Sequence, residues 1–150
     1  MTETDRDNTW LANRLEQLRQ RCFEDVAIGN LIQVRFGRIT KTRLGSITTR
    51  RLAGKPAISL ITINGLFRNQ EVPAEVIDAV LGHEFTHYAH GWHSPHPKLY
   101  SHPHRGGIVD KELLERGLGS ALKEQQRWVK GNFARLYRAE RPLAKPRLWR

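Results

Sequence analysis

The feature that most constrains this chain is the sequence His-Glu-Phe-Thr-His at residues 83–87, because it lies within a helical pattern of apolar residues. Four residues of an α-helix turn through about 400°, so the spacing predicts that His83 and His87 project from one face. Glu84 is predicted to lie about 100° further round the helix, beside the two imidazoles. Two neutral imidazoles in this arrangement can bind one divalent metal ion, most often zinc.

The same spacing indicates a class of reaction. Zinc lowers the pKa of a bound water to about 7, and a neighbouring glutamate can accept the proton of that water and pass it to a leaving amine. The motif therefore predicts Zn²⁺-dependent hydrolysis of a peptide-like bond, with His83 and His87 as ligands and Glu84 as the catalytic residue. The alternative is a core helix with two hydrogen-bonded histidines. A buried helix rarely accepts such polar groups without a compensating partner, which favours the metal site.

The helix that carries the motif is predicted to span residues 73–91. Pro73 suits the first turn, and Gly91 is a typical helix stop. Apolar residues recur at helical spacing at Val76, Ile77, Val80, Leu81, Phe85 and Tyr88. The helix should therefore be buried, with its histidines pointing into the protein.

The length of 150 residues fits one domain, with a core over about residues 9–120 and a basic C-terminal helix and tail over 120–150. We expect an α+β fold in which a small antiparallel or mixed three-stranded sheet packs on the motif helix. The other expected elements are helices over 9–26, 108–116 and 120–133, and strands over 32–36, 41–50 and 58–63.

The third metal ligand is expected in the loop after the motif helix, because a catalytic zinc site takes three protein ligands and keeps one position open. His93 lies six residues after His87, and His104 directly precedes the next predicted helix. A ligand at the start of a packed helix is better preorganised than one in the middle of a loop. We therefore favour His104, with His93 as the main alternative and His102 behind them.

The net charge of +10 is unevenly distributed. Residues 31–55 contain seven basic side chains and no acidic one, and residues 123–150 contain nine basic side chains. Such segments either solvate the surface or contact a polyanion, most simply DNA. In the second segment Trp128 and Trp149 are candidates for stacking on unpaired bases, although Trp128 also fits a core position.

The sequence contains no apolar run of transmembrane length and no signal-peptide pattern, so we expect no membrane contact. The single Cys22 cannot form an internal disulfide. This cysteine usage fits a reducing compartment, and the expected localisation is cytoplasmic.

The order of these parts resembles the SprT-like and WLM families of minimal zinc metallopeptidases. The resemblance covers roughly residues 10–120. It is carried by Arg43-Leu44-Gly45-Ser46-Ile47, by the strand Ile58–Ile63, and by the run from Glu75 to His87. It implies a zincin-like fold and a protein substrate, and members of the superfamily include proteases that digest proteins crosslinked to DNA.

Carried over by position, the resemblance implies that His83 and His87 are ligands and that Glu84 is the acid/base. The position of His93 is similar to the short-loop WLM spacing, and that of His104 to the longer-loop SprT pattern. The chain departs from many SprT-like proteins because its single cysteine excludes a four-cysteine zinc ribbon. Two other functions are consistent with the sequence: a nucleic-acid-binding module with a structural zinc, and a metal-free interaction domain.

Overall fold

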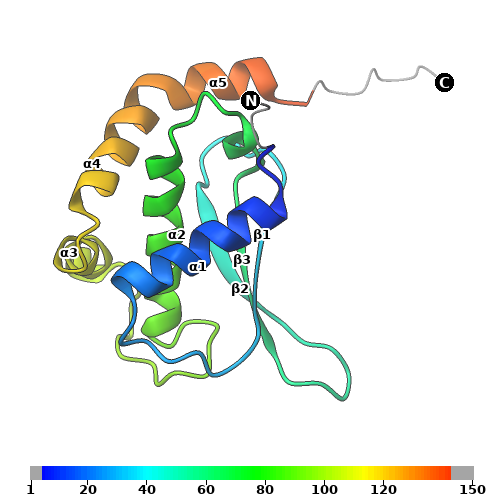
Figure 1. The fold of residues 1–150 in the computed structure, drawn as a ribbon, viewed down its shortest axis with the longest axis vertical. Coiled ribbons are helices and arrows are strands. Elements are labelled where there is room, and N and C mark those ends of the chain that lie inside the picture. The colour runs from blue at the N-terminus through cyan, green and yellow to red at the C-terminus, as the bar shows by residue number, and fades with distance from the viewer. Residues whose placement is uncertain (1–4, 143–150) are drawn as a thin grey trace.

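A computed structural model describes residues 5–142 of the chain (Figure 1). Its helices are α1 (Asn8–Cys22), α2 (Ala74–Ala89), α3 (Ile108–Glu115), α4 (Gly119–Trp128) and α5 (Ala134–Glu140), and its strands are β1 (Ile32–Phe36), β2 (Gly45–Arg50) and β3 (Ile58–Ile63). These elements confirm the expected α+β class, with α2 as the motif helix.

The three strands form one mixed sheet in the order β1-β3-β2. The central strand β3 pairs in parallel with β1 and antiparallel with β2, where Ile61 lies opposite Ile47. Strand β2 is therefore an edge strand. It begins at Gly45 and not at residue 41 as expected, because a buried side chain, Asn64, holds residues 40–43 in a loop through hydrogen bonds to Thr40 and Arg43.

Helix α2 lies between the sheet on one side and α3 and α4 on the other (Figure 1). Its apolar residues are almost wholly inaccessible, as the sequence stripe predicts. Small residues bring its neighbours close: a Cβ atom on Gly82 would lie 2.9 Å from a methyl group of Leu118, and one on Gly45 would lie 2.9 Å from a methyl group of Val80. The motif histidines are thus attached to the most enclosed element of the fold.

Helix α1 begins where the Asp7 side chain accepts a hydrogen bond from the Trp10 amide, and it ends at Cys22, four residues earlier than expected. It is joined to α2 by Arg14, whose guanidinium donates two hydrogen bonds, of 2.7 and 2.9 Å, to the carboxylate of Asp78. Because Asp78 is 6% exposed, this bidentate pair compensates a charge inside the fold.

The C-terminal helical segment is longer than the sequence indicates. After α4, a π-helical turn (Val129–Phe133) continues directly into α5, so the helix does not stop near residue 133. Trp128 is 6% exposed and packs edge-to-face on Phe67 and Phe133. This burial contradicts the stacking role considered for Trp128, while Trp149 lies outside the described residues.

Within residues 5–142, no helix combines the length and the apolar character that crossing a membrane requires.

Candidate metal centre

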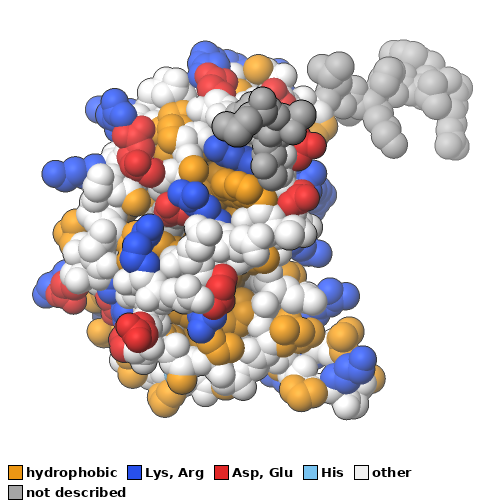
Figure 2. Space-filling model, viewed as in Figure 1, with side chains coloured by type: hydrophobic (Ala, Val, Ile, Leu, Met, Phe, Trp, Pro, Cys, Tyr) orange, Lys and Arg blue, Asp and Glu red, His pale blue; other side chains and the backbone are white. Residues whose placement is uncertain are grey.

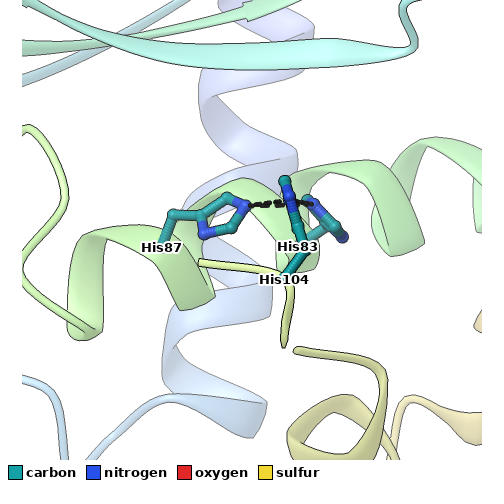
Figure 3. A group of neighbouring side chains, drawn as sticks. All are labelled: His83, His87 and His104. Atoms are coloured by element: carbon teal, nitrogen blue, oxygen red, sulfur yellow. Dashed lines mark hydrogen bonds between the residues drawn. The ribbon is translucent and has the colours of Figure 1, made fainter. Parts of the chain in front are cut away.

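Helix α2 presents His83 and His87 one turn apart, as their spacing predicts. Their Nε2 atoms lie 3.1 Å apart, and their rings meet edge-to-face with centroids 4.7 Å apart (Figure 3). His87 is buried, and His83 is partly exposed. Both side chains therefore direct the same ring nitrogen toward one point beside the helix.

The loop after α2 folds back on the end of the helix. Gly91 has a φ of 86°, and a Cβ atom there would collide with the carbonyl oxygen of Pro97 at 2.4 Å. The Trp92 amide donates a hydrogen bond to the carbonyl of His87, and the Leu99 amide donates one to the carbonyl of His90. A glycine at position 91 thus allows the chain to reverse and to return past the two histidines.

His104 completes the group from the opposite side. Its Nε2 atom lies 3.2 Å from that of His83 and 2.9 Å from that of His87 (Figure 3). Directly after it, Gly106 and Gly107 have φ values of 71° and 65° and turn the chain into α3. This left-handed turn favours glycine, so the His-Arg-Gly-Gly sequence is the local reason that the imidazole is held at the start of α3.

The structure does not bring the alternative ligands into this group. His93 lines the same cleft, but its Nδ1 atom contacts the Thr49 hydroxyl at 2.9 Å and its carbonyl accepts a hydrogen bond from Ser59. His93 therefore fastens the loop to β2 and β3. Among the described residues, the cluster of potential ligands contains only His83, His87 and His104.

The three nitrogens cannot satisfy one another by hydrogen bonding. In a neutral imidazole each Nε2 is either a donor or an acceptor. Among three mutually adjacent nitrogens at least two are of the same kind, so at least one of the three contacts places two protons or two lone pairs against each other. A cation that accepts all three lone pairs removes this conflict, and this favours a metal site over a hydrogen-bonded core cluster.

The donor set fits zinc. Nitrogens at tetrahedral angles and about 2.0–2.1 Å from zinc lie about 3.3 Å apart, close to the 2.9–3.2 Å found between the three Nε2 atoms. No fourth His, Cys, Asp or Glu of residues 5–142 joins the cluster. Three imidazoles with no fourth protein ligand are the donor set of a catalytic zinc site.

The surroundings of His83 and His87 keep both imidazoles neutral at neutral pH. The pKa of His87 is lowered to about 3, mainly by burial and further by the neighbouring His83, His104 and His90. Burial also lowers the pKa of His83, with a second contribution from His104, although Asp110 acts in the opposite direction. Both lone pairs are therefore available to a metal at neutral pH, since a metal binds the unprotonated ring.

Glu84 lies beside the three histidines in a cleft of about 400 Å³, whose other wall includes β2. Glu84 is 6% exposed, and its carboxyl group forms no hydrogen bond with another described residue. Burial raises its pKa to about 7, and the nearby Arg43 opposes this shift. Glu84 is thus a carboxyl group that can exchange a proton near neutral pH, which is the property that a general base and acid needs.

Residues behind the cluster hold α2 against α3. The His90 side chain is 2% exposed, and its Nε2 atom lies 2.8 Å from a carboxylate oxygen of Glu112. Glu112 also accepts a hydrogen bond from Arg116, which pairs with Asp25 beyond α1. The sequence does not reveal these partners, because they are distant along the chain and follow no motif.

The chain matches no known family model, no characterised protein and no solved structure.

Replacement of His104 by Ala should weaken zinc binding by at least about 100-fold, because loss of an outer hydrogen-bonding partner alone commonly costs 10–100-fold. His93→Ala should change the affinity much less, since His93 lies outside the cluster. Competition with a chromophoric chelator measures both dissociation constants. Greater loss of zinc from His93→Ala than from His104→Ala would show that the short-loop ligand is the correct one.

Zinc binding should release up to one proton more from wild type than from Glu84→Gln at pH 6. With a pKa of about 7, Glu84 is mostly protonated there, and a nearby divalent cation favours the carboxylate. The affinity of wild type should therefore rise more steeply with pH between about 5 and 7. Calorimetric titrations in buffers of different ionisation enthalpy count the protons, and equal numbers for both proteins would contradict the assigned proximity.

Proposed function

We propose that this chain is a zinc-dependent peptidase that hydrolyses peptide bonds in proteins. The observation that carries the proposal is the convergence of three histidine Nε2 atoms within 3.2 Å of one another beside the buried Glu84. A structural zinc normally has four protein ligands, whereas this cluster supplies three. The donor set therefore favours hydrolysis over a nucleic-acid-binding module with a structural zinc.

The reaction needs an electrophilic centre and a group that moves a proton. Zinc, when bound by the three histidines, supplies Lewis-acid activation of water and of the scissile carbonyl. Glu84 then accepts a proton at its carboxylate as water attacks, and donates it to the amine that leaves. Because Glu84 is only 6% exposed, this carboxyl group is largely shielded from bulk solvent.

The cleft also offers a way to orient a polypeptide. Strand β2 is an edge strand, and its residues Gly45, Ser46, Ile47 and Thr48 line the cleft opposite the histidines. An extended peptide can add to such an edge through main-chain hydrogen bonds, which are independent of side-chain identity. This arrangement supports a protein substrate that is bound in an extended conformation across the metal centre.

Membership of the SprT-like and WLM families, with their zincin-like fold, is part of this proposal. The order of α1, the three strands, α2 and α3 supports it, as does the position of His104 directly before α3, which is similar to the longer-loop SprT pattern. The free, half-buried Cys22 fits the expected cytoplasmic location.

We further propose that DNA is a partner and that it contacts the β2–β3 turn. Within residues 31–55 all seven basic side chains are exposed, and none forms an ion pair with a described acidic residue. The turn carries Arg51 and Lys55 and protrudes from the sheet, whereas acidic and basic side chains are mixed over the face that α1 crosses (Figures 1 and 2). In the segment 123–150, by contrast, Arg127 and Arg135 pair with acidic residues.

Wild type should bind a fluorescent oligonucleotide independently of sequence, and the affinity should fall steeply with salt because phosphate contacts release counterions. Arg51→Gln/Lys55→Gln should weaken the binding and reduce its salt dependence. Fluorescence anisotropy at low and moderate salt measures both effects. Absence of binding at low salt would show that DNA is not a partner. Equal binding by the two proteins would show that the turn does not contact DNA.

Glu84→Gln should retain zinc and the fold but lose about 10²- to 10⁴-fold in the rate of protein hydrolysis, because an amide cannot accept the proton of the attacking water. Cleavage of unfolded casein by zinc-loaded protein measures the rate, and metal analysis and circular dichroism provide the controls. Hydrolysis at the wild-type rate by the variant would show that Glu84 is not the catalytic residue.

A further inference from the structure

A second groove opens beside the metal cleft, at the end of the sheet where β2 begins. Its volume is about 430 Å³, and it shares Arg43, Gly45 and Ser46 with the cleft. The two hollows are therefore neighbouring parts of one surface along the edge strand. A polypeptide that lies in the cleft along β2 enters this groove when it continues past Gly45.

The groove has a strongly basic lining. Arg35, Arg38 and Arg43 all line it, and no acidic residue does. All three side chains are exposed, and their guanidinium groups form no hydrogen bond or ion pair with any residue in the described part of the chain. Three like charges around one groove maintain a positive potential there, and their hydrogen-bond donors remain available to a ligand.

Arg35 lies on β1, whereas Arg43 lies in the loop before β2, which the Asn64 side chain holds from below. Asn64 is 4% exposed, and its amide nitrogen donates hydrogen bonds to the carbonyls of Thr40 and Arg43 at 2.9 and 2.8 Å. Its amide oxygen accepts a hydrogen bond from the Thr40 amide, and the Thr40 hydroxyl donates one to the Arg43 carbonyl. This buried network fixes the main chain of residues 40–43, so Arg43 is presented from a preorganised backbone.

We infer that the groove binds acidic side chains of the substrate polypeptide, on one side of the scissile bond, and so determines which proteins are cleaved. This inference rests on the proposed peptidase function. Planar guanidinium groups bind carboxylates through two parallel hydrogen bonds, and Arg is better suited to this than Lys. A polypeptide is favoured over a nucleic acid as the occupant because the groove continues the cleft in which the scissile bond lies.

The test uses zinc-loaded protein and a quenched fluorescent peptide that wild type cleaves at a mapped bond. An Asp-Glu pair is placed before the bond in one peptide and after it in another, and each is compared with its Asn-Gln counterpart. For one of the two placements, wild type should show a kcat/KM at least about tenfold higher for the acidic peptide, as expected for charge-assisted hydrogen bonds. The ratio should approach one in Arg35→Gln/Arg38→Gln.

A matched variant separates this effect from the overall positive charge. Arg21→Gln/Lys111→Gln removes the same two charges from exposed positions on α1 and α3, and it should keep the wild-type ratio. Equal cleavage of acidic and amide peptides by wild type would overturn the inference. A preference that persists in Arg35→Gln/Arg38→Gln, or that falls equally in the matched variant, would also overturn it.

Binding to the zinc-loaded Glu84→Gln protein distinguishes failure of this inference from failure of the proposed function. Labelled acidic peptide should bind about tenfold more tightly than its amide counterpart, and Arg35→Gln/Arg38→Gln should abolish the difference. If wild type cleaves no peptide but this difference in affinity is found, the proposed peptidase function is wrong, and the groove is still a binding site for acidic peptides. If a single-stranded oligonucleotide displaces the acidic peptide and binds more tightly through the same two arginines, the occupant is a nucleic acid and the inference is wrong.

Discussion

The arrangement of the site depends on the burial of α2 between the sheet and the helices α3 and α4. An exposed helix with the same motif would leave its imidazoles in water, where hydrogen bonds to solvent satisfy them. Here the helix is enclosed on both sides, and the close approach at Gly45 and Gly82 leaves little freedom for it to shift. His83 and His87 are consequently fixed on a rigid element, and His104 is brought to them by the start of another packed helix. Such support lets a site keep its geometry when a metal binds.

The same burial sets the charges of the site. It is the main cause that lowers the pKa of His87 to about 3 and raises that of Glu84 to about 7, so the cleft places the neutral imidazoles of His83 and His87 beside a carboxyl group that exchanges its proton near pH 7. A bound divalent cation would accept the imidazole lone pairs and would favour the carboxylate form of Glu84. Arg43 acts in the same direction on Glu84 and also begins the basic groove. Burial of α2 thus affects both metal affinity and proton transfer at Glu84, and the exposed Arg43 connects this cleft to the proposed acidic-peptide groove.

The sequence was most informative where a short-range rule applied. The period of α2, the i, i+4 placement of His83 and His87, and the α+β class follow from local patterns, and the Gly-Gly pair after His104 marks the turn that positions it. It was least informative where distant residues meet. Tertiary packing determines the Asn64 hydrogen bonds before β2, the His90–Glu112 contact and the burial of Trp128. Contacts of this kind produce no periodic pattern in the sequence. The sheet could be predicted only in part, because the sequence indicates its three strands but not their order.

The central claim is that zinc is held by three histidines and retains a position for chemistry. X-ray absorption spectroscopy of the zinc-loaded protein tests it most directly, because this method reports the type and number of ligands independently of any substrate. The account predicts three imidazole nitrogens at about 2.0–2.1 Å together with one oxygen ligand that is not from an imidazole. In His104→Ala the imidazole count should fall to two. Four imidazoles in the wild-type protein, or three that persist in His104→Ala, would contradict the proposed centre.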